Sequence, residues 1–264
     1  MNSPGDRPEL RSSLQLFPPI ALGDLGRVKL MDREDTKFIF HEDQLGDVLS
    51  QLRGSYQVLE IESTRLFQYD TRYLDTPDLG FYMQHHNGRR PRIKIRYRRY
   101  HQPAAVYFEI KTKNNRNRTT KQRFSVDEVS SSPGARELDF LKQHLGSCPA
   151  LQTTLDVRFF RFTLVHKSEP DRITIDVGLE TRGPGEWYQN GNLVIAEIKQ
   201  PRYRPDSIFF KVMQSANIPE MRLSKYCLGM LQTWPGIKYN RFKPKLLRLN
   251  QILNTRQNTE ILNA

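Results

Sequence analysis

A short stretch in the first half of the sequence, residues 92–98, places a cation at every second position. These cations are Arg92, Lys94, Arg96 and Arg98, and the residues between them are two isoleucines and a tyrosine. Successive side chains of a β-strand point to opposite faces, so the four cations would share one face. Four like charges on one face repel each other, which indicates either an anionic ligand or a solvated outer surface.

Charged residues alternate with apolar residues in the same way in several other segments. The positions concerned are Arg33, Asp35, Lys37, Glu109, Lys111, Lys113, Lys121, Arg123, Arg172, Asp176, Glu197 and Lys199. An antiparallel sheet with a polar concave face, or a barrel with a charged lumen, explains this recurrence better than a set of independent surfaces. Arginine binds phosphate oxygens bidentately and lysine supplies a point charge, so such an interior is suited to a chain of phosphates.

Two carboxylates, Glu109 and Glu197, each begin a Glu-Ile-Lys triplet, which places the Glu and the Lys on the same face of a strand. A carboxylate among cations is able to hold a divalent metal that bridges phosphate oxygens. The alternative for Glu109 is a cross-strand ion pair with a neighbouring Lys or Arg. Asp176 is open to either interpretation.

The composition narrows the possible partners. The chain has 264 residues and a formal net charge of +12, which suggests polyphosphate, nucleotide, nucleic acid or an acidic membrane surface as partner. The cations alternate with aliphatic residues instead of exposed aromatics, which argues against nucleic acid as the partner. No apolar run approaches the roughly 20 residues needed to span a bilayer. The two cysteines form neither a disulfide framework nor a zinc site, which favours a reducing cytoplasm, and no P-loop motif is present.

The chain divides into three parts. Residues 1–26 are rich in Pro, Ser and Gly and are expected to be a flexible leader. Residues 27–235 predict an α+β domain of about eight antiparallel strands with flanking helices. Residues 236–264 are basic and then rich in Asn and Gln, which predicts a C-terminal tail or a loose helix.

Eight short motifs follow one another in an order that resembles a known family. They are DREDTKF (32–38), YLDTPD (73–78), KIRYRRY (94–100), FEIKTK (108–113), TKQRF (120–124), RITID (172–176), AEIK (196–199) and RLSKYCLG (222–229). The order resembles the catalytic domain of the vacuolar transporter chaperone (VTC) proteins, of bacterial type, within the triphosphate tunnel metalloenzyme (CYTH-like) superfamily. The resemblance covers about residues 27–235.

The resemblance implies an eight-stranded antiparallel β-barrel, the triphosphate tunnel. It also implies a metal-dependent polyphosphate polymerase that transfers the γ-phosphate of ATP to a polyphosphate chain, with Mn²⁺ or Mg²⁺ as cofactor. The alternatives are an inorganic triphosphatase or NTPase on the same fold and a non-catalytic polyphosphate-binding module.

Residue roles follow from the motifs and from the alternating cations. Lys37 and Glu197 are expected to be catalytic, and Glu197 and Glu109 to bind metal. The expected substrate-binding residues are Arg92, Lys94, Arg96, Arg98, Lys111, Lys113, Lys121, Arg123, Arg161, Arg172, Lys199, Arg222 and Lys225.

The sequence departs from the family pattern at two places. The superfamily's first strand carries ExExK, and the matching positions here are Arg33, Asp35 and Lys37. The loss of two glutamates argues against plain triphosphate hydrolysis with metal held there. Phe159 stands where a tyrosine is common, which removes one hydrogen bond to phosphate. Eukaryotic members pass polymer across a bilayer, so a separate membrane protein is a possible partner; the oligomeric state stays open.

Overall fold

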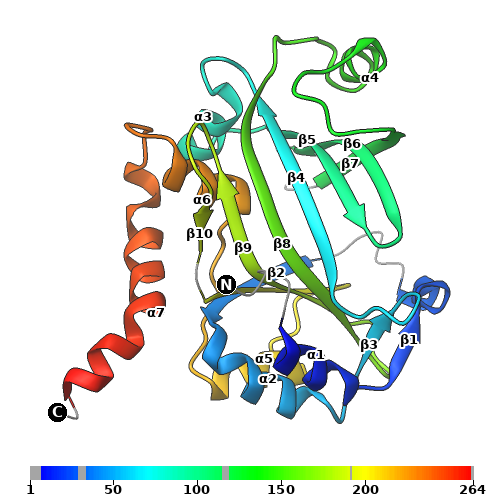
Figure 1. The fold of residues 1–264 in the computed structure, drawn as a ribbon, viewed down its shortest axis with the longest axis vertical. Helices are drawn as coiled ribbons and strands as arrows, with labels where there is room; N and C mark the ends of the chain where they lie inside the picture. The colour runs from blue at the N-terminus through cyan, green and yellow to red at the C-terminus, as the bar shows by residue number, and fades with distance from the viewer. Residues whose placement is uncertain (1–6, 29–33, 115–118, 191, 263–264) are drawn as a thin grey trace.

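The computed structural model (Figure 1) describes residues 7–28, 34–114, 119–190 and 192–262 of the chain. Its centre is a large sheet in which eight antiparallel strands follow the order β2-β11-β9-β8-β4-β5-β6-β7. These strands are β2 (Glu34–His41), β4 (Phe67–Asp75), β5 (Arg92–His101), β6 (Ala104–Lys113), β7 (Thr119–Val126), β8 (Gln152–His166), β9 (Arg172–Arg182) and β11 (Leu193–Gln200). Three short strands, β1 (Pro19–Ala21), β3 (Tyr56–Glu60) and β10 (Tyr188–Gln189), pair at its sides.

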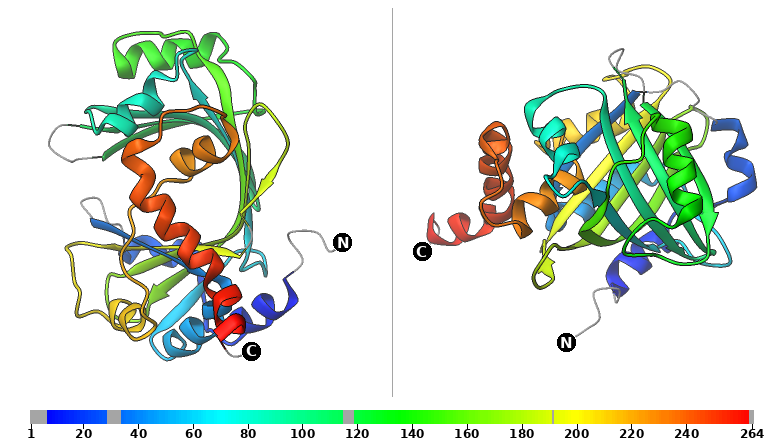
Figure 2. Two further views of the ribbon diagram at one scale, coloured as in Figure 1. Left: turned by 90° about the vertical axis from the view of Figure 1, so that its left-hand side faces the viewer. Right: turned by 90° about the horizontal axis from the view of Figure 1, so that it is seen from above.

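The sheet curls strongly, and helix α6 (Lys225–Thr233) lies on its concave side (Figure 2). The predicted α+β class and the antiparallel arrangement of eight strands are therefore confirmed. The predicted closure into a barrel is not observed. Within the described part of the chain, β2 and β7 are the two ends of the strand order and do not pair with each other.

Alternation along the strands separates the two faces of the sheet. On β2, Phe38 and Phe40 enter an apolar cluster on the outer face, while Lys37 points to the opposite, concave side. On β5, Ile95 and Tyr97 pack outward. The alternating cations therefore lie on the concave face, as their spacing predicted.

The helices cover both faces. Beside α6, they are α1 (Pro8–Gln15), α2 (Leu45–Leu52), α3 (Gly80–Asn87), α4 (Ala135–Leu145), α5 (Ile208–Ser215) and α7 (Lys243–Leu262), with short 3₁₀ turns at Leu22–Val28, Glu42–Gln44 and Asn240–Phe242. Helices α1, α2 and α5 pack against the outer face of β2, β9 and β11, and α4 packs against the outer face of β5 and β6. No helix among the described residues is both long and apolar enough to cross a membrane.

The N-terminal segment differs from the flexible leader that its composition suggested. Helix α1 begins with Pro8 in its first turn, and Leu10 and Leu14 lie one turn apart on the same side. Both leucines and the following Phe17 are buried in the cluster that also contains Phe38 and Phe40. Two leucines at helical spacing are enough to hold a short helix in place when the rest of the fold provides a hydrophobic surface against which they pack. Residues 1–6 lie outside the described part.

We expect Leu14→Ala to lower the free energy of unfolding by about 2–4 kcal/mol, because it empties a fully packed site. Leu14 is 1% exposed. The matched control is Leu16→Ala in the same segment, since Leu16 is 53% exposed and should change stability by less than about 0.5 kcal/mol. Urea denaturation measures both. Equal effects of the two substitutions would mean that α1 does not dock on the sheet.

Candidate functional site

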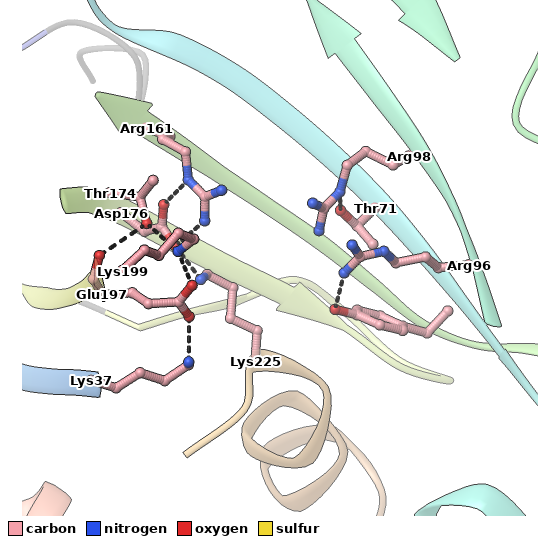
Figure 3. Close-up of polar contacts among 11 residues, drawn as sticks. Lys37, Thr71, Arg96, Arg98, Arg161, Thr174, Asp176, Glu197, Lys199 and Lys225 are labelled. Atoms are coloured by element: carbon pink, nitrogen blue, oxygen red, sulfur yellow. Dashed lines mark hydrogen bonds and ion pairs between the residues drawn. The ribbon is translucent and has the colours of Figure 1, made fainter. Parts of the chain in front are cut away.

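The concave face carries two groups of ion-paired side chains, and Figure 3 shows the first of them together with Arg96 and Arg98, which lie near the second. The first, called the Glu197 cluster, comes from β2, β8, β9, β11 and the start of α6. Lys37 lies directly opposite Glu197 across the β2–β11 pair. Lys37 and Lys199 each form an ion pair with one oxygen of the Glu197 carboxylate. Glu197 is therefore held between two ammonium groups.

Asp176 forms the second anionic centre of the Glu197 cluster. The guanidinium of Arg161 donates two hydrogen bonds to its carboxylate, at 2.5 and 2.8 Å, and the Lys225 ammonium pairs with the same group. Lys225 is the first residue of α6. Ser224 caps that helix by accepting a hydrogen bond from the Cys227 amide, which fixes where Lys225 leaves the backbone.

The charges in this cluster are strongly coupled. Burial by itself would raise the pKa of Glu197, but Lys199 and Lys37 hold it well below its usual value. Burial likewise opposes ionisation of Asp176, and Arg161 and Lys225 lower its pKa to about 2. Both carboxylates are therefore ionised at neutral pH.

A second cluster surrounds Glu109 on β6, which is only 1% exposed. Arg96 contacts one of its oxygens at 2.6 Å and Lys121 the other at 2.5 Å, while Arg123 lies 3.9 Å away. Burial raises the pKa of Glu109, but Arg96, Arg98 and Lys121 outweigh it and bring the pKa to about 2. Glu109 thus makes the cross-strand ion pairs that were the alternative to metal binding.

A row of like charges lies next to the Glu109 cluster on the same three strands. Lys94, Lys111 and Lys121 lie directly opposite one another on β5, β6 and β7. Lys121 is neutralised by Glu109, but Lys94 and Lys111 make no hydrogen bond or ion pair with any described residue. Like charges facing each other across strands destabilise a sheet. Burial, followed by repulsion from Lys94, lowers the pKa of Lys111 to about 7.

The curl of the sheet brings the two walls within electrostatic reach. Lys37 on the β2 wall contributes to lowering the pKa of Lys94 on the β5 wall. The negative charges of Glu197 and Asp35 raise the pKa of Lys111 and so partly oppose its lowering by burial. The predicted catalytic residues therefore face the unpaired lysines across the concavity.

The remaining predicted residues line the ends of the same face. Arg92 lies opposite Lys113, and Lys113 lies within electrostatic reach of Arg222. Arg172 lies opposite Lys199 at the other end of β11. Arg98 donates a hydrogen bond to Thr71 at 3.3 Å. Arg33 lies outside the described residues.

Aromatic side chains on β4 and β8 also belong to the site; the sequence pointed to the position of Phe159 but not to Tyr69. Tyr69 and Phe159 stack with ring centroids 5.2 Å apart. The Lys225 ammonium lies 4.6 Å from the centre of the Phe159 ring, and the Arg161 guanidinium lies over both rings. Phe159 therefore supports cations through its π face. The signal in the sequence for Tyr69 was its position at an inward-facing site of its strand.

Asp75, in the motif YLDTPD, has a positioning role. It is fully buried and accepts hydrogen bonds from the Phe81 and Tyr82 amides, both at 2.8 Å, and from the Tyr226 hydroxyl. It thereby ties α3 and α6 to the end of β4. His85 on α3 lies near Lys94 and Arg92, and burial together with these charges lowers its pKa to about 2.

The side chains of the site fit a divalent metal only if substrate phosphate oxygens supply most of its ligands. No three His, Cys, Asp or Glu side chains gather as ligands in the described segments, so a cage made of protein groups alone does not fit. Mg²⁺ and similar ions are often held by one carboxylate together with substrate phosphate oxygens. Glu197, which faces the unpaired lysines, fits that arrangement better than the enclosed Glu109.

Comparisons with known proteins place this geometry in a family. The model of the VTC domain matches residues 32–234. The solved structure of HpAC1 from Hippeastrum, named as a candidate adenylyl cyclase with a dominant triphosphatase activity, is 14% identical with a TM-score of 0.50, covering 78% of this chain and 98% of its own. A candidate adenylate cyclase from Bacillus halodurans is 12% identical with a TM-score of 0.48, covering 74% and 96%. Another from Vibrio parahaemolyticus is 12% identical with a TM-score of 0.44, covering 75% and 99%.

No curated protein shows significant similarity to the sequence. The likeness to HpAC1 supports the fold, and the family match spans the whole of the cationic face described above. The order of motifs in the sequence therefore predicted the family correctly: the chain belongs to the VTC domain family.

Proposed function

We propose that this protein is a metal-dependent polyphosphate polymerase, which transfers the γ-phosphate of ATP to a polyphosphate chain bound on the concave face. The observation that carries the proposal is the row of Lys94 and Lys111. These two ammonium groups lack a partner and face Glu197 across the concavity. An unpaired pair of partly buried cations is costly in the free protein, and a chain of phosphates supplies the missing negative charge.

The charge distribution favours an extended phosphate ligand over a single one. Cations line the face from Arg92 at one end to Arg172 at the other, while the carboxylates Glu109, Asp176 and Glu197 are each already paired with cations. ATP and the acceptor chain would together place several phosphates along this face. Positioning and electrostatic stabilisation would then carry most of the catalysis.

Each residue has a definite task in this proposal. Lys37 would stabilise charge on the transferring phosphoryl group. Lys94, Lys111 and the Arg96–Arg98 pair would hold the phosphate oxygens of substrate and acceptor. Glu197 would hold Mn²⁺ or Mg²⁺ jointly with those oxygens. When bound, the metal would neutralise and align the oxygens of the reacting phosphates.

A triphosphatase or NTPase is the second candidate, because HpAC1, whose fold is similar, has a dominant triphosphatase activity. Water would then replace the phosphate acceptor. A non-catalytic polyphosphate-binding module would use the same cations without turnover. The presence of Arg33 and Asp35 in place of the two glutamates of the superfamily's ExExK motif favours the polymerase over the hydrolase. A separate membrane protein remains a proposed partner of a cytoplasmic polymerase.

The test is incubation of the purified protein with ATP and Mn²⁺, assayed for ADP, for free phosphate and for long-chain polyphosphate on a gel. We expect polymer from the unchanged chain and none from Lys37→Ala. The matched control is Lys142→Ala on the outer helix α4, where the lysine is exposed. Free phosphate without polymer would establish the hydrolase instead. Binding of ATP or polyphosphate without formation of ADP would establish the binding module.

The titration of Lys111 gives a further prediction. Its pKa is about 7 in the free protein, and bound phosphates would raise that pKa, so binding should draw a proton onto Lys111 above pH 7. We therefore expect Lys111 to contribute an uptake of up to about one proton per triphosphate at pH 8, and the affinity to weaken as the pH rises. Calorimetry in two buffers of different ionisation enthalpy measures this uptake. An unchanged uptake in Lys111→Gln would exclude Lys111 as its source.

A further inference from the structure

A pocket of about 190 Å³ opens on the outer face of the sheet, on the side of β4 and β8 away from the concavity. No helix crosses over the middle of these strands in Figure 1. We call it the outer arginine pocket, and its charged and aromatic lining includes Arg72, Arg99, Asp156, Arg158, Arg182 and Trp187. These lining residues on β4, β5, β8 and β9 occupy positions that alternate with the inward-facing residues, and Trp187 lies in the loop before β10, so the pocket is separate from the site described above.

The carboxylate of Asp156 in the pocket accepts hydrogen bonds from two arginines. Arg72, Asp156 and Arg182 lie opposite one another on β4, β8 and β9. Arg72 donates two hydrogen bonds to Asp156, at 2.8 and 3.1 Å, and Arg182 donates a third at 2.8 Å. This row is a closed ion-pair network that forms one wall and has no further need of an anion.

The neighbouring row is not closed in the same way. Arg99 and Arg158 lie on either side of Asp70, on β5 and β8. Asp70 contacts His101 at 2.9 Å and Arg158 only at 3.9 Å. Arg99 makes no hydrogen bond or ion pair with any residue in the described segments, although it is partly buried in the pocket wall. The pocket as a whole has four arginines against two aspartates.

Trp187 holds two of these arginines in place. The guanidinium carbon of Arg158 lies 4.1 Å from the indole centre and that of Arg182 lies 4.8 Å from it. A guanidinium stacked on an aromatic ring keeps its N–H edge free for an anion, and it loses little conformational entropy on binding. The indole is already engaged by these arginines, which leaves room for a compact oxyanion and not for a stacked nucleobase.

We propose that the outer arginine pocket binds a compact phosphate oxyanion, orthophosphate or diphosphate, at a site distinct from the concave face. Arg99 supplies donors that have no partner among the described residues, and Arg158 adds a guanidinium whose ion pair with Asp70 is long. Trp187 fixes the orientation of Arg158. This proposal does not depend on whether the concave face polymerises phosphate.

The two tryptophans of the chain, Trp187 and Trp234, provide a direct probe. Incorporation of 5-fluorotryptophan into the 264-residue chain gives one ¹⁹F resonance for each, and Trp187→Phe assigns them. Trp234 packs in the apolar cluster around α6 and donates a hydrogen bond to the Thr154 carbonyl, so it serves as the internal reference. Orthophosphate and diphosphate are titrated in separate experiments, and the tighter of the two identifies the ligand.

We expect the Trp187 resonance to shift saturably as one of these anions is added. The same shift should occur in the variant Lys94→Gln, in which anion binding to the concave face is weakened. Arg99→Gln should weaken the binding at Trp187 by about tenfold or more, because a charge-assisted donor is lost. Since Arg99 makes no hydrogen bond or ion pair with a described residue, this variant should fold normally. The matched control, Arg53→Gln at an exposed position on α2's end, should bind as the unchanged chain does.

Two results would overturn the proposal. The first is the absence of any saturable shift of Trp187 at millimolar anion, which would make the pocket a solvated ion-pair network. The second is a shift that is lost in Lys94→Gln but retained in Arg99→Gln, which would assign the binding to the concave face.

Discussion

Replacing Glu197 with glutamine should lower polymer formation from ATP by about a hundredfold or more while the sheet stays folded. The amide keeps the shape of the side chain but removes the charge that holds Lys37 and Lys199 in place. It also removes the carboxylate that we propose as the protein's ligand to the metal. Both losses act on the reacting phosphates, so the effect should fall mainly on kcat.

The Mn²⁺ dependence separates the two roles of Glu197. If Glu197 holds metal, Glu197→Gln should also raise the Mn²⁺ concentration needed for half-maximal activity. If it only positions lysines, that concentration should stay the same while the rate falls. Glu34→Gln, at an exposed position on β2, is the matched control and should leave both quantities unchanged. Full activity in Glu197→Gln would remove Glu197 from the mechanism.

Replacing Lys111 with glutamine should have opposite effects on stability and on binding. The ammonium of Lys111 is partly buried, lacks a partner and faces Lys94. Removing it should raise the free energy of unfolding of the ligand-free protein by about 1–2 kcal/mol near neutral pH. The same change should weaken triphosphate binding by about tenfold to a hundredfold, because one charge-assisted contact is lost.

The increase in the free energy of unfolding caused by Lys111→Gln should depend on pH, and the direction of that dependence follows from the pKa of Lys111. Folding lowers the pKa of Lys111 from 10.5 to about 7, so the folded state disfavours its proton. The stability of the unchanged chain should therefore fall as the pH drops from about 10 to 7, and the variant should lack that part of the decrease. Thermal denaturation with and without triphosphate measures both effects, with Lys142→Gln as control. A variant that is less stable than the unchanged chain would show that Lys111 has a partner in the folded state.

The sequence was informative where a property is local to one strand. The alternation of cations and apolar residues over 92–98 is a property of strand geometry, and it placed Arg92, Lys94, Arg96 and Arg98 on one face correctly. The order of eight short motifs identified the family, which the match over residues 32–234 confirms. The roles of Lys37 and Glu197 stay predictions, but the structure places these two residues opposite each other.

Properties that depend on distant segments could not be read in this way. Two leucines in a Pro- and Ser-rich segment gave no sign of a docked helix, because the hydrophobic surface that receives α1 is built from β2, β9, α2 and α5. The partners of Glu109 and Asp176 were equally undetermined. A carboxylate binds metal or an ion pair according to what its neighbouring strands present, and strand order is fixed only in the folded sheet.

The sequence by itself thus determined the family, the class of fold and which face of each strand carries charge, because side-chain alternation follows from backbone geometry alone. Only the tertiary structure decided which charges neutralise one another. The register of β5, β6 and β7 places Glu109 in ion pairs with Arg96 and Lys121. The same register leaves Lys94 and Lys111 without a partner among the described residues. The curl of the sheet then brought these lysines opposite Lys37 and Glu197, since residues far apart in the chain meet only when the strands are assembled.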